Sequence, residues 1–132
     1  DVWSVTSFNE LRREGLDVER WNMLNPEKKQ KLSYVAECLK GAQGPVIAST
    51  DYMKSFAEQI ATFVPGKFVA LGTDGYGRSD SREALRSFFE VDRYYVVLAT
   101  LKALADEGKL PASKAAEAIK KYKLDANKPT PT

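Results

Sequence analysis

The chain has 132 residues, 43% of them hydrophobic, which is the size and composition of one domain with an ordinary core. Twenty basic and eighteen acidic residues give a net charge of +2, which argues against a nucleic acid or an anionic membrane as partner. The absence of histidine excludes the commonest general base, the commonest metal ligand and every nucleophile that a histidine would activate.

The single cysteine, Cys38, cannot form a disulfide within the chain. A lone cysteine on the face of a predicted helix is typical of a reducing compartment, so we expect a cytoplasmic protein. There is no signal peptide and no apolar run long enough to cross a bilayer, which predicts a soluble chain.

The first 26 residues predict a strand followed by helix. Apolar and polar residues alternate from Val2 to Phe8, as in a strand, and the chain enters this segment without a starter methionine or a flexible lead. Ser7 and Glu10 form a capping box, which predicts that a helix begins at once. A second helical segment is predicted from Val18 to Leu24, because Asn25-Pro26 disfavours helical geometry.

The middle of the chain alternates helix and strand. A helix is predicted from about Leu32 to Lys40, and a short buried strand at Val46–Ser49. Asp51 is the predicted cap of the next helix. Its buried face would consist of Tyr52, Phe56, Ile60 and Phe63. The apolar segment Phe68–Leu71 predicts a third strand near the centre of the sheet.

Three further helices are predicted after that strand. Asp80 and Glu83 form a capping box for a helix over 81–88. Asp92 caps a longer helix through Leu104, which Gly108 terminates. The last helix is predicted over 111–122.

This order predicts an α/β fold, a three-layer α/β/α sandwich with a mostly parallel sheet. Three strands are few for such a sheet, so we expect at least one strand to precede residue 1 in an intact domain. The predicted domain covers residues 1–124, and residues 125–132 are predicted to be a flexible tail.

Residues 72–80, which we call the glycine loop, form the main candidate site. Three glycines within six residues permit unusual backbone angles and close approach by another group, at the edge of the sheet where α/β proteins bind ligands. The candidate contact residues are Thr73, Asp74, Tyr76, Arg78 and Ser79. One interpretation is an anion site with Arg78 as the bidentate partner; the other is a rigid turn that contacts a neighbouring domain or subunit.

The second interpretation is favoured for two reasons. The glycine spacing matches neither the Walker lysine loop nor the dinucleotide fingerprint. Asp74 and Asp80 would also repel an anion. These two carboxylates together with Asp92 could instead bind magnesium or act in acid–base chemistry, but capping explains Asp80 and Asp92 better.

Several lysines could favour an acidic partner, although interspersed lysines usually form a solvated face. They are Lys28, Lys29, Lys31, Lys109, Lys114, Lys120, Lys121 and Lys123. The residues by themselves predict no catalytic, cofactor-binding or metal-binding group. Some of the aromatic side chains exceed what a small core needs and are expected to face a partner.

Two stretches resemble the C-terminal domain of the pyruvate dehydrogenase E1 component, in its single-chain homodimeric bacterial form. One is LGTDGYGRSDSREALRSFFEVD, residues 71–92; the other is residues 1–26, with DVWSVTSF and ERWNMLNP. A looser resemblance, through Tyr76, Gly77, Ser79, Leu85 and Phe89, is to the final domain of transketolases. Glycine is usual there at the positions of Asp80 and Glu90, and these departures favour the E1 family.

The resemblance implies a parent enzyme that uses thiamine diphosphate and magnesium to decarboxylate pyruvate and passes the acetyl unit to the lipoyl group of the E2 component. It implies that the cofactor lies between two preceding domains of opposite subunits, so that this domain holds no catalytic, cofactor or metal residue and binds no cofactor by itself. It also implies a mixed sheet whose first strand and helix precede Asp1.

The implied partners are the other domains of the same E1 chain, the second subunit of the homodimer, and E2 dihydrolipoyl acetyltransferase. The domain would support the dimer, flank the channel to the cofactor or offer a surface to E2, with no nucleic acid or membrane partner. The alternatives are the C-terminal domain of a transketolase-type enzyme, and a small anion-binding or interaction module.

Overall fold

The computed structural model describes residues 1–132 and contains two short strands among seven helical segments. In chain order these are α1 (Phe8–Leu24), α2 (Tyr34–Cys38), β1 (Val46–Ser49), α3 (Lys54–Glu58), the 3-10 helix η1 (Ala61–Phe63), β2 (Phe68–Leu71), α4 (Arg82–Phe88), α5 (Arg93–Asp106) and α6 (Ser113–Tyr122).

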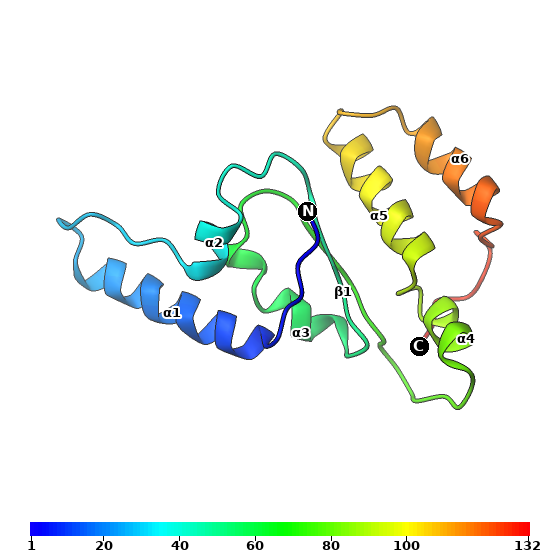
Figure 1. The fold of residues 1–132 in the computed structure, drawn as a ribbon, viewed down its shortest axis with the longest axis horizontal. Coiled ribbons are helices and arrows are strands. Elements are labelled where there is room, and N and C mark those ends of the chain that lie inside the picture. The colour runs from blue at the N-terminus through cyan, green and yellow to red at the C-terminus, as the bar shows by residue number, and fades with distance from the viewer.

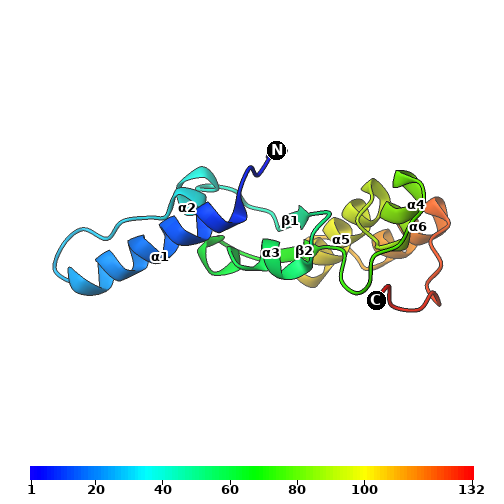
Figure 2. The same ribbon diagram turned by 90° about the horizontal axis from the view of Figure 1, so that it is seen from below.

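The two strands form a parallel pair between two groups of helices, as Figure 1 shows. Val46 pairs with Phe68 and Ser49 with Leu71. Helices α1, α2 and α3 lie on one side of the strands, and α4, α5 and α6 lie on the other; the view from below agrees (Figure 2). The α/β class and the parallel sheet are thus confirmed, with helices on both sides of a sheet of only two strands.

The main core lies between the sheet and the first group of helices. Its buried centre consists of Val35, Ile60, Phe63 and Val64, against which Phe8, Leu11, Leu39, Val46 and Phe68 pack. On the other side of the strands the buried residues are mostly small, as Ala103, Ala115 and Ala118 show. Small side chains let α5 and α6 pack closely together.

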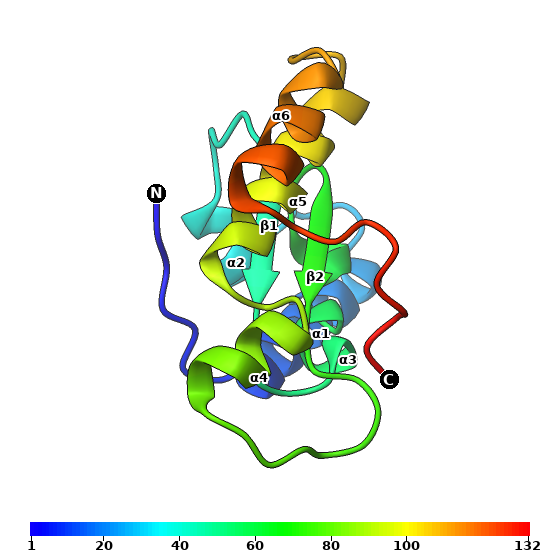
Figure 3. The same ribbon diagram turned by 90° about the vertical axis from the view of Figure 1, so that its right-hand side faces the viewer.

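Residues 1–6 form no strand, which corrects the first sequence prediction. Their backbone makes no hydrogen bond to a neighbouring strand, and Val2, Trp3 and Val5 are exposed. A strand requires a partner for its backbone groups, and alternation of side chains supplies none. Figure 3 shows this opening segment at the side of β1, separated from it.

The prediction of a separate second helical segment from Val18 to Leu24 was also wrong, because α1 runs without interruption from Phe8 to Leu24. Ser7 begins it as expected, accepting a hydrogen bond from the Glu10 amide at 3.3 Å. Gly15 is buried where α1 crosses the ring of Phe63, and a Cβ there would lie 2.6 Å from that ring. Glycine inside a helix costs only about 1 kcal/mol, so close packing overrides its low propensity.

Two helix caps differ from the predictions. The helix after β1 begins at Lys54, not after Asp51, and ends at Glu58 before the 3-10 turn of η1. Ser81 caps α4 by accepting from the Ala84 amide, while Asp80 accepts from the Ser81 amide. The helix predicted over 32–40 is two residues shorter at each end, since α2 covers Tyr34–Cys38 only. The last helix, α6, begins at Ser113 and not at Pro111.

The predictions for α5 were confirmed at both ends. Asp92 accepts hydrogen bonds from the Tyr94 and Tyr95 amides at 2.8 and 3.0 Å. Gly108 follows the helix with a φ of 71°, and the next amide, of Lys109, returns to the Leu104 carbonyl. This is the six-to-one bond of a Schellman motif, which satisfies carbonyls that the helix end leaves free.

Much apolar surface remains uncovered in this chain. Only 13 of the 132 residues are buried, whereas Met23, Leu24 and Tyr34 are each more than half exposed. No helix is both long and apolar enough to cross a membrane.

Candidate functional site

The glycine loop begins at the carboxyl end of β2 and is fastened to the segment that follows β1. The Thr73 amide donates to the Tyr52 carbonyl at 2.9 Å, and the Thr73 hydroxyl donates to the Asp51 carbonyl at 2.6 Å. Gly72 passes so close that a Cβ there would lie 2.6 Å from the Lys54 backbone nitrogen. The first glycine of the loop is therefore required for packing and not for positive φ.

Asp74 caps helix α3 from a distant part of the chain. Its Oδ1 accepts from the Lys54 amide at 3.0 Å, and its Oδ2 lies 3.9 Å from the Lys54 Nζ. Met53, at the N-cap position, has no side chain that could do this. A carboxylate at a helix start satisfies a free amide and complements the helix dipole. Asp74 is therefore a structural cap, and it takes the role that sequence reasoning gave to Asp51.

The outer half of the loop faces solvent. Tyr76 is 90% exposed, and Ser79 is exposed as well. The Arg78 guanidinium lies over the ring of Phe88, 4.0 Å from its centre, in a cation–π contact. The predicted contact residues therefore divide into two sets: Thr73 and Asp74 hold the loop in place, while Tyr76, Arg78 and Ser79 form its outer surface.

A shallow hollow of about 490 Å³ lies between the loop and α4. Arg78, Arg82 and Arg86 line it, together with Asp51 and Asp80. Arg86 is paired with Asp51 at 3.4 Å, and Arg78 is stacked as described. Two of the three arginines are therefore already engaged, and an anion bound here would compete with these contacts and would lie beside two carboxylates.

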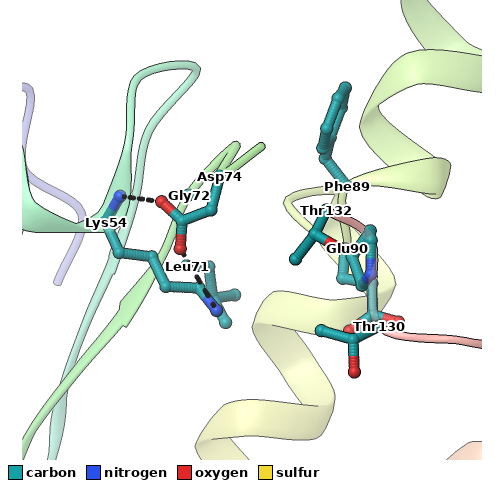
Figure 4. Close-up of a pocket in the computed structure, with 9 residues that line it drawn as sticks. Lys54, Leu71, Gly72, Asp74, Phe89, Glu90, Thr130 and Thr132 are labelled. Atoms are coloured by element: carbon teal, nitrogen blue, oxygen red, sulfur yellow. Dashed lines mark hydrogen bonds and ion pairs between the residues drawn. The ribbon is translucent and has the colours of Figure 1, made fainter. Parts of the chain in front are cut away.

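A second, smaller crevice of about 90 Å³ lies at the end of β2 (Figure 4). One wall consists of Lys54, Leu71, Gly72 and Asp74. The opposite wall consists of Phe89, Glu90 and the segment Thr130–Thr132. The chain's own last residues thus border the position where α/β sheets commonly bind a ligand.

Tyr95 and Asp106, both on α5, have pKa values shifted from their usual range. Burial raises the pKa of the Tyr95 phenol, and the nearby Glu90 carboxylate raises it further. Hydrogen bonds from Lys102 and then Lys67 hold the pKa of the Asp106 carboxyl below its usual range. Lys67 precedes β2, and its ammonium lies 2.7 Å from Asp106, so this ion pair ties α5 to the sheet.

The residues of this chain do not fit thiamine diphosphate with magnesium. No three side chains among histidine, cysteine, aspartate and glutamate come together as metal ligands. Asp74, Asp80 and Asp92, the carboxylates weighed from the sequence, are separately engaged: Asp74 caps α3, Asp80 accepts from Ser81 and Asp92 caps α5. No step of cofactor chemistry can be assigned to these side chains.

The basic segment after α1 folds back onto that helix. Lys31 exchanges two hydrogen bonds of 2.9 Å with the Asn22 side chain through its backbone, and its ammonium lies 4.0 Å from the Trp21 ring centre. Lys28 lies over the same ring at 5.7 Å. Two of the lysines weighed as an acidic-partner surface therefore cover a tryptophan.

Sequence reasoning missed the contacts of Lys128. Its ammonium bonds to the backbone at the end of α4, 40 residues away in the chain. Glu90, beside it, has a left-handed backbone with a φ of 62°. The only signal in the sequence was that transketolases usually have glycine at the Glu90 position.

Comparison with known proteins agrees with this fold. A family model of the Transketolase-like TK C-terminal domain matches residues 1–92. The pyruvate dehydrogenase E1 components of Cupriavidus necator and Pseudomonas aeruginosa are each 65% identical to 99% of this chain. That of Escherichia coli K12 is 54% identical over 132 residues, again 99% of the chain.

The chain belongs to the transketolase-like C-terminal domain family. It spans 15% of the length of the curated E1 relatives that it matches. The resemblance found in the two sequence stretches is therefore confirmed. Of the two families considered, E1 components and transketolases, the E1 components are the more specific match.

Proposed function

We propose that this chain is a non-catalytic, C-terminal domain of a pyruvate dehydrogenase E1 component. The observation that carries the proposal is 65% identity over 99% of the chain to two E1 components. The parent enzyme would use thiamine diphosphate and magnesium to decarboxylate pyruvate and would reductively acetylate the lipoyl group of E2, in the cytoplasm. The cofactor would be bound by other domains.

The domain would act through its surfaces. Exposed apolar residues on and after α1, among them Leu16, Met23, Leu24 and Leu32, support contacts with other domains of the same chain or with the second subunit. The outer surface of the glycine loop, with Tyr76, Arg78 and Ser79, is the proposed contact of the site itself. A nearly fully exposed tyrosine close to the anchored residues Thr73 and Asp74 suits this role, because its ring is available to be buried against a partner.

The identity of the parent protein is tested by capture from cells. An antiserum against residues 1–132 should isolate a polypeptide several times longer than this chain, whose mass is then measured by mass spectrometry. The captured protein should release carbon dioxide from pyruvate only when thiamine diphosphate and magnesium are present. A captured chain of about 132 residues, or one without this activity, would contradict the proposal.

The contact role of the loop is tested by Tyr76→Ala in that full-length protein. We expect the partial reaction, pyruvate decarboxylation with an artificial electron acceptor, to be retained while the affinity for the subunit or for E2 falls. The mass of the assembled enzyme in solution reports on contact with the second subunit, and binding to lipoylated E2 reports on contact with E2. Tyr52→Ala is the matched control, because Tyr52 is also exposed, at 68%, but lies outside the loop. Equal behaviour of both variants would refute a specific contact at Tyr76.

A further inference from the structure

The segment after α6 is turned back along the molecule by its own backbone. Lys123 has a left-handed φ of 54°, and the Leu124 amide returns to the Ile119 carbonyl at 3.0 Å. This is a Schellman motif, which fixes the direction of the chain beyond the helix. Asp125 then accepts from the Asn127 amide at 2.9 Å and forms a second turn.

Lys128 is anchored at the carboxyl end of α4. Its ammonium donates to the carbonyls of Ser87, at 3.1 Å, and Phe88, at 2.5 Å, and lies 3.5 Å from a Glu90 carboxylate oxygen. Two of the three donors of this ammonium are thus hydrogen-bonded to carbonyls, and the Glu90 carboxylate balances its charge. Its side chain is only 22% exposed. A cation at this position also complements the negative end of the helix dipole.

Phe88 connects this anchor to the glycine loop. Lys128 lies 5.2 Å from the centre of the Phe88 ring, and Arg78 of the loop lies 4.0 Å from the same centre. The loop and the segment after α6 are thus both held by one aromatic ring through cation–π contacts.

Glu90 occupies a backbone position that normally requires glycine. Its φ is 62°, and the Val91 amide returns to the Arg86 carbonyl at 3.0 Å, so Glu90 is the left-handed residue that ends α4. A side chain there adds strain that glycine would avoid. Only a side chain can reach the Lys128 ammonium, however, so the departure from glycine is explained by this ion pair.

The segment ends against the glycine loop. Thr130, Pro131 and Thr132 border the crevice beside β2. Thr132 lies directly on Gly75, where a Cβ would be 2.4 Å from the Thr132 carbonyl carbon. Gly75 also has a φ of 91°, so both its backbone angle and its neighbour exclude a larger residue.

We infer that residues 124–132 form a strap that holds the glycine loop against α4, with the Lys128–Glu90 pair as its anchor. The strap borders the crevice at the end of β2 and contacts Gly75. The outer surface of the glycine loop, with Tyr76, is left open to a partner. The strap thereby sets the position of this outer surface. It is formed by residues of this chain alone, so the inference does not depend on the proposed function. The inference opposes the expectation that residues 125–132 are flexible.

Hydrogen exchange of backbone amides in the full-length protein tests the strap. The amides to follow are those of Lys54 and Thr73, which report on the loop, and that of Val91, which reports on the end of α4. Lys128→Met keeps the length of the side chain and removes the charge. We expect it to speed exchange at all three amides by roughly tenfold, the effect of losing charge-assisted hydrogen bonds.

Two further variants make the result specific. Lys120→Met changes an exposed lysine in the last turn of α6 and should leave all three amides unchanged. Replacement of residues 129–132 by glycine and serine keeps the Lys128 anchor, so it should speed exchange at Thr73 but not at Val91. If Lys128→Met does not fold, this second variant tests the strap by itself. Unchanged exchange at Thr73 in both strap variants would overturn the inference.

Discussion

Gly15 provides the sharpest test of how this core is built. A Cβ added there would lie 2.6 to 2.7 Å from three atoms of the Phe63 ring, closer than real contacts permit. Phe63 is 8% exposed and packed against Val35, Ile60 and Val64, so the ring has no free space to enter. Gly15→Ala therefore forces either the ring or helix α1 to move.

The size of the effect follows from two opposing terms. Alanine gains about 1 kcal/mol of helix propensity over glycine. Overpacking of a core costs typically about 1–3 kcal/mol, and three ring atoms in contact place this site at the upper end. We expect a net loss of about 1–2 kcal/mol in the free energy of unfolding, measured by urea denaturation.

A double-mutant cycle separates packing from propensity. Phe63→Leu alone should destabilise the core, but in its presence Gly15→Ala should be neutral or stabilising, with a coupling of about 1 kcal/mol or more. Gly77→Ala is the control for a glycine without neighbours, since no atom lies within 4 Å of its added Cβ. If Gly15→Ala raises stability in the wild-type background, the packing argument is wrong.

Four further predictions concern the loop and the helix ends. Gly72→Ala should destabilise by about 2 kcal/mol or more, because the clash is with the Lys54 backbone and not with a movable side chain; urea denaturation checks it. Asp74→Ala should cost about 1 kcal/mol by uncapping α3, while Asp74→Asn should retain most of the stability, and equal losses would contradict the capping role. The pKa of Asp106 is lower in the folded state, so its ionised carboxylate stabilises the fold fully above about pH 4–5, and this stabilisation is lost as the pH falls further. Asp106→Asn should therefore lower the free energy of unfolding at pH 7 and make stability fall less steeply in acid. Lys123→Gly should raise the melting temperature by a few degrees, because it relieves a left-handed residue by up to about 1 kcal/mol; a decrease would refute this.

Features carried by neighbouring residues were predictable from the sequence. The Asp92 cap and the Gly108 terminus of α5 depend on contacts within a few positions, and the apolar segments of β1 and β2 are each a continuous run of residues. The family was recognisable for the same reason, since its most specific stretch, residues 71–92, is continuous.

The position of the candidate site in the chain was predicted correctly, but the roles of its individual side chains were not. The glycines and polar residues identified the loop, but a sequence does not show which of Thr73, Asp74 and Tyr76 point inward. Asp51 and Asp74 are equally good helix caps in principle; the crossing of the loop over the segment before α3 decided between them. The opening segment, in contrast, has a strand pattern and no hydrogen-bonded partner strand.

By itself the sequence determined the α/β class, the absence of histidine chemistry and the place of the loop after β2, because these depend on composition and on short-range periodicity. Only the tertiary structure decided that Gly15 accommodates Phe63, that Asp74 caps α3 and that Lys128 meets Glu90. Each of these is a contact between residues 20 or more positions apart, and such contacts arise only when packing brings separate elements together.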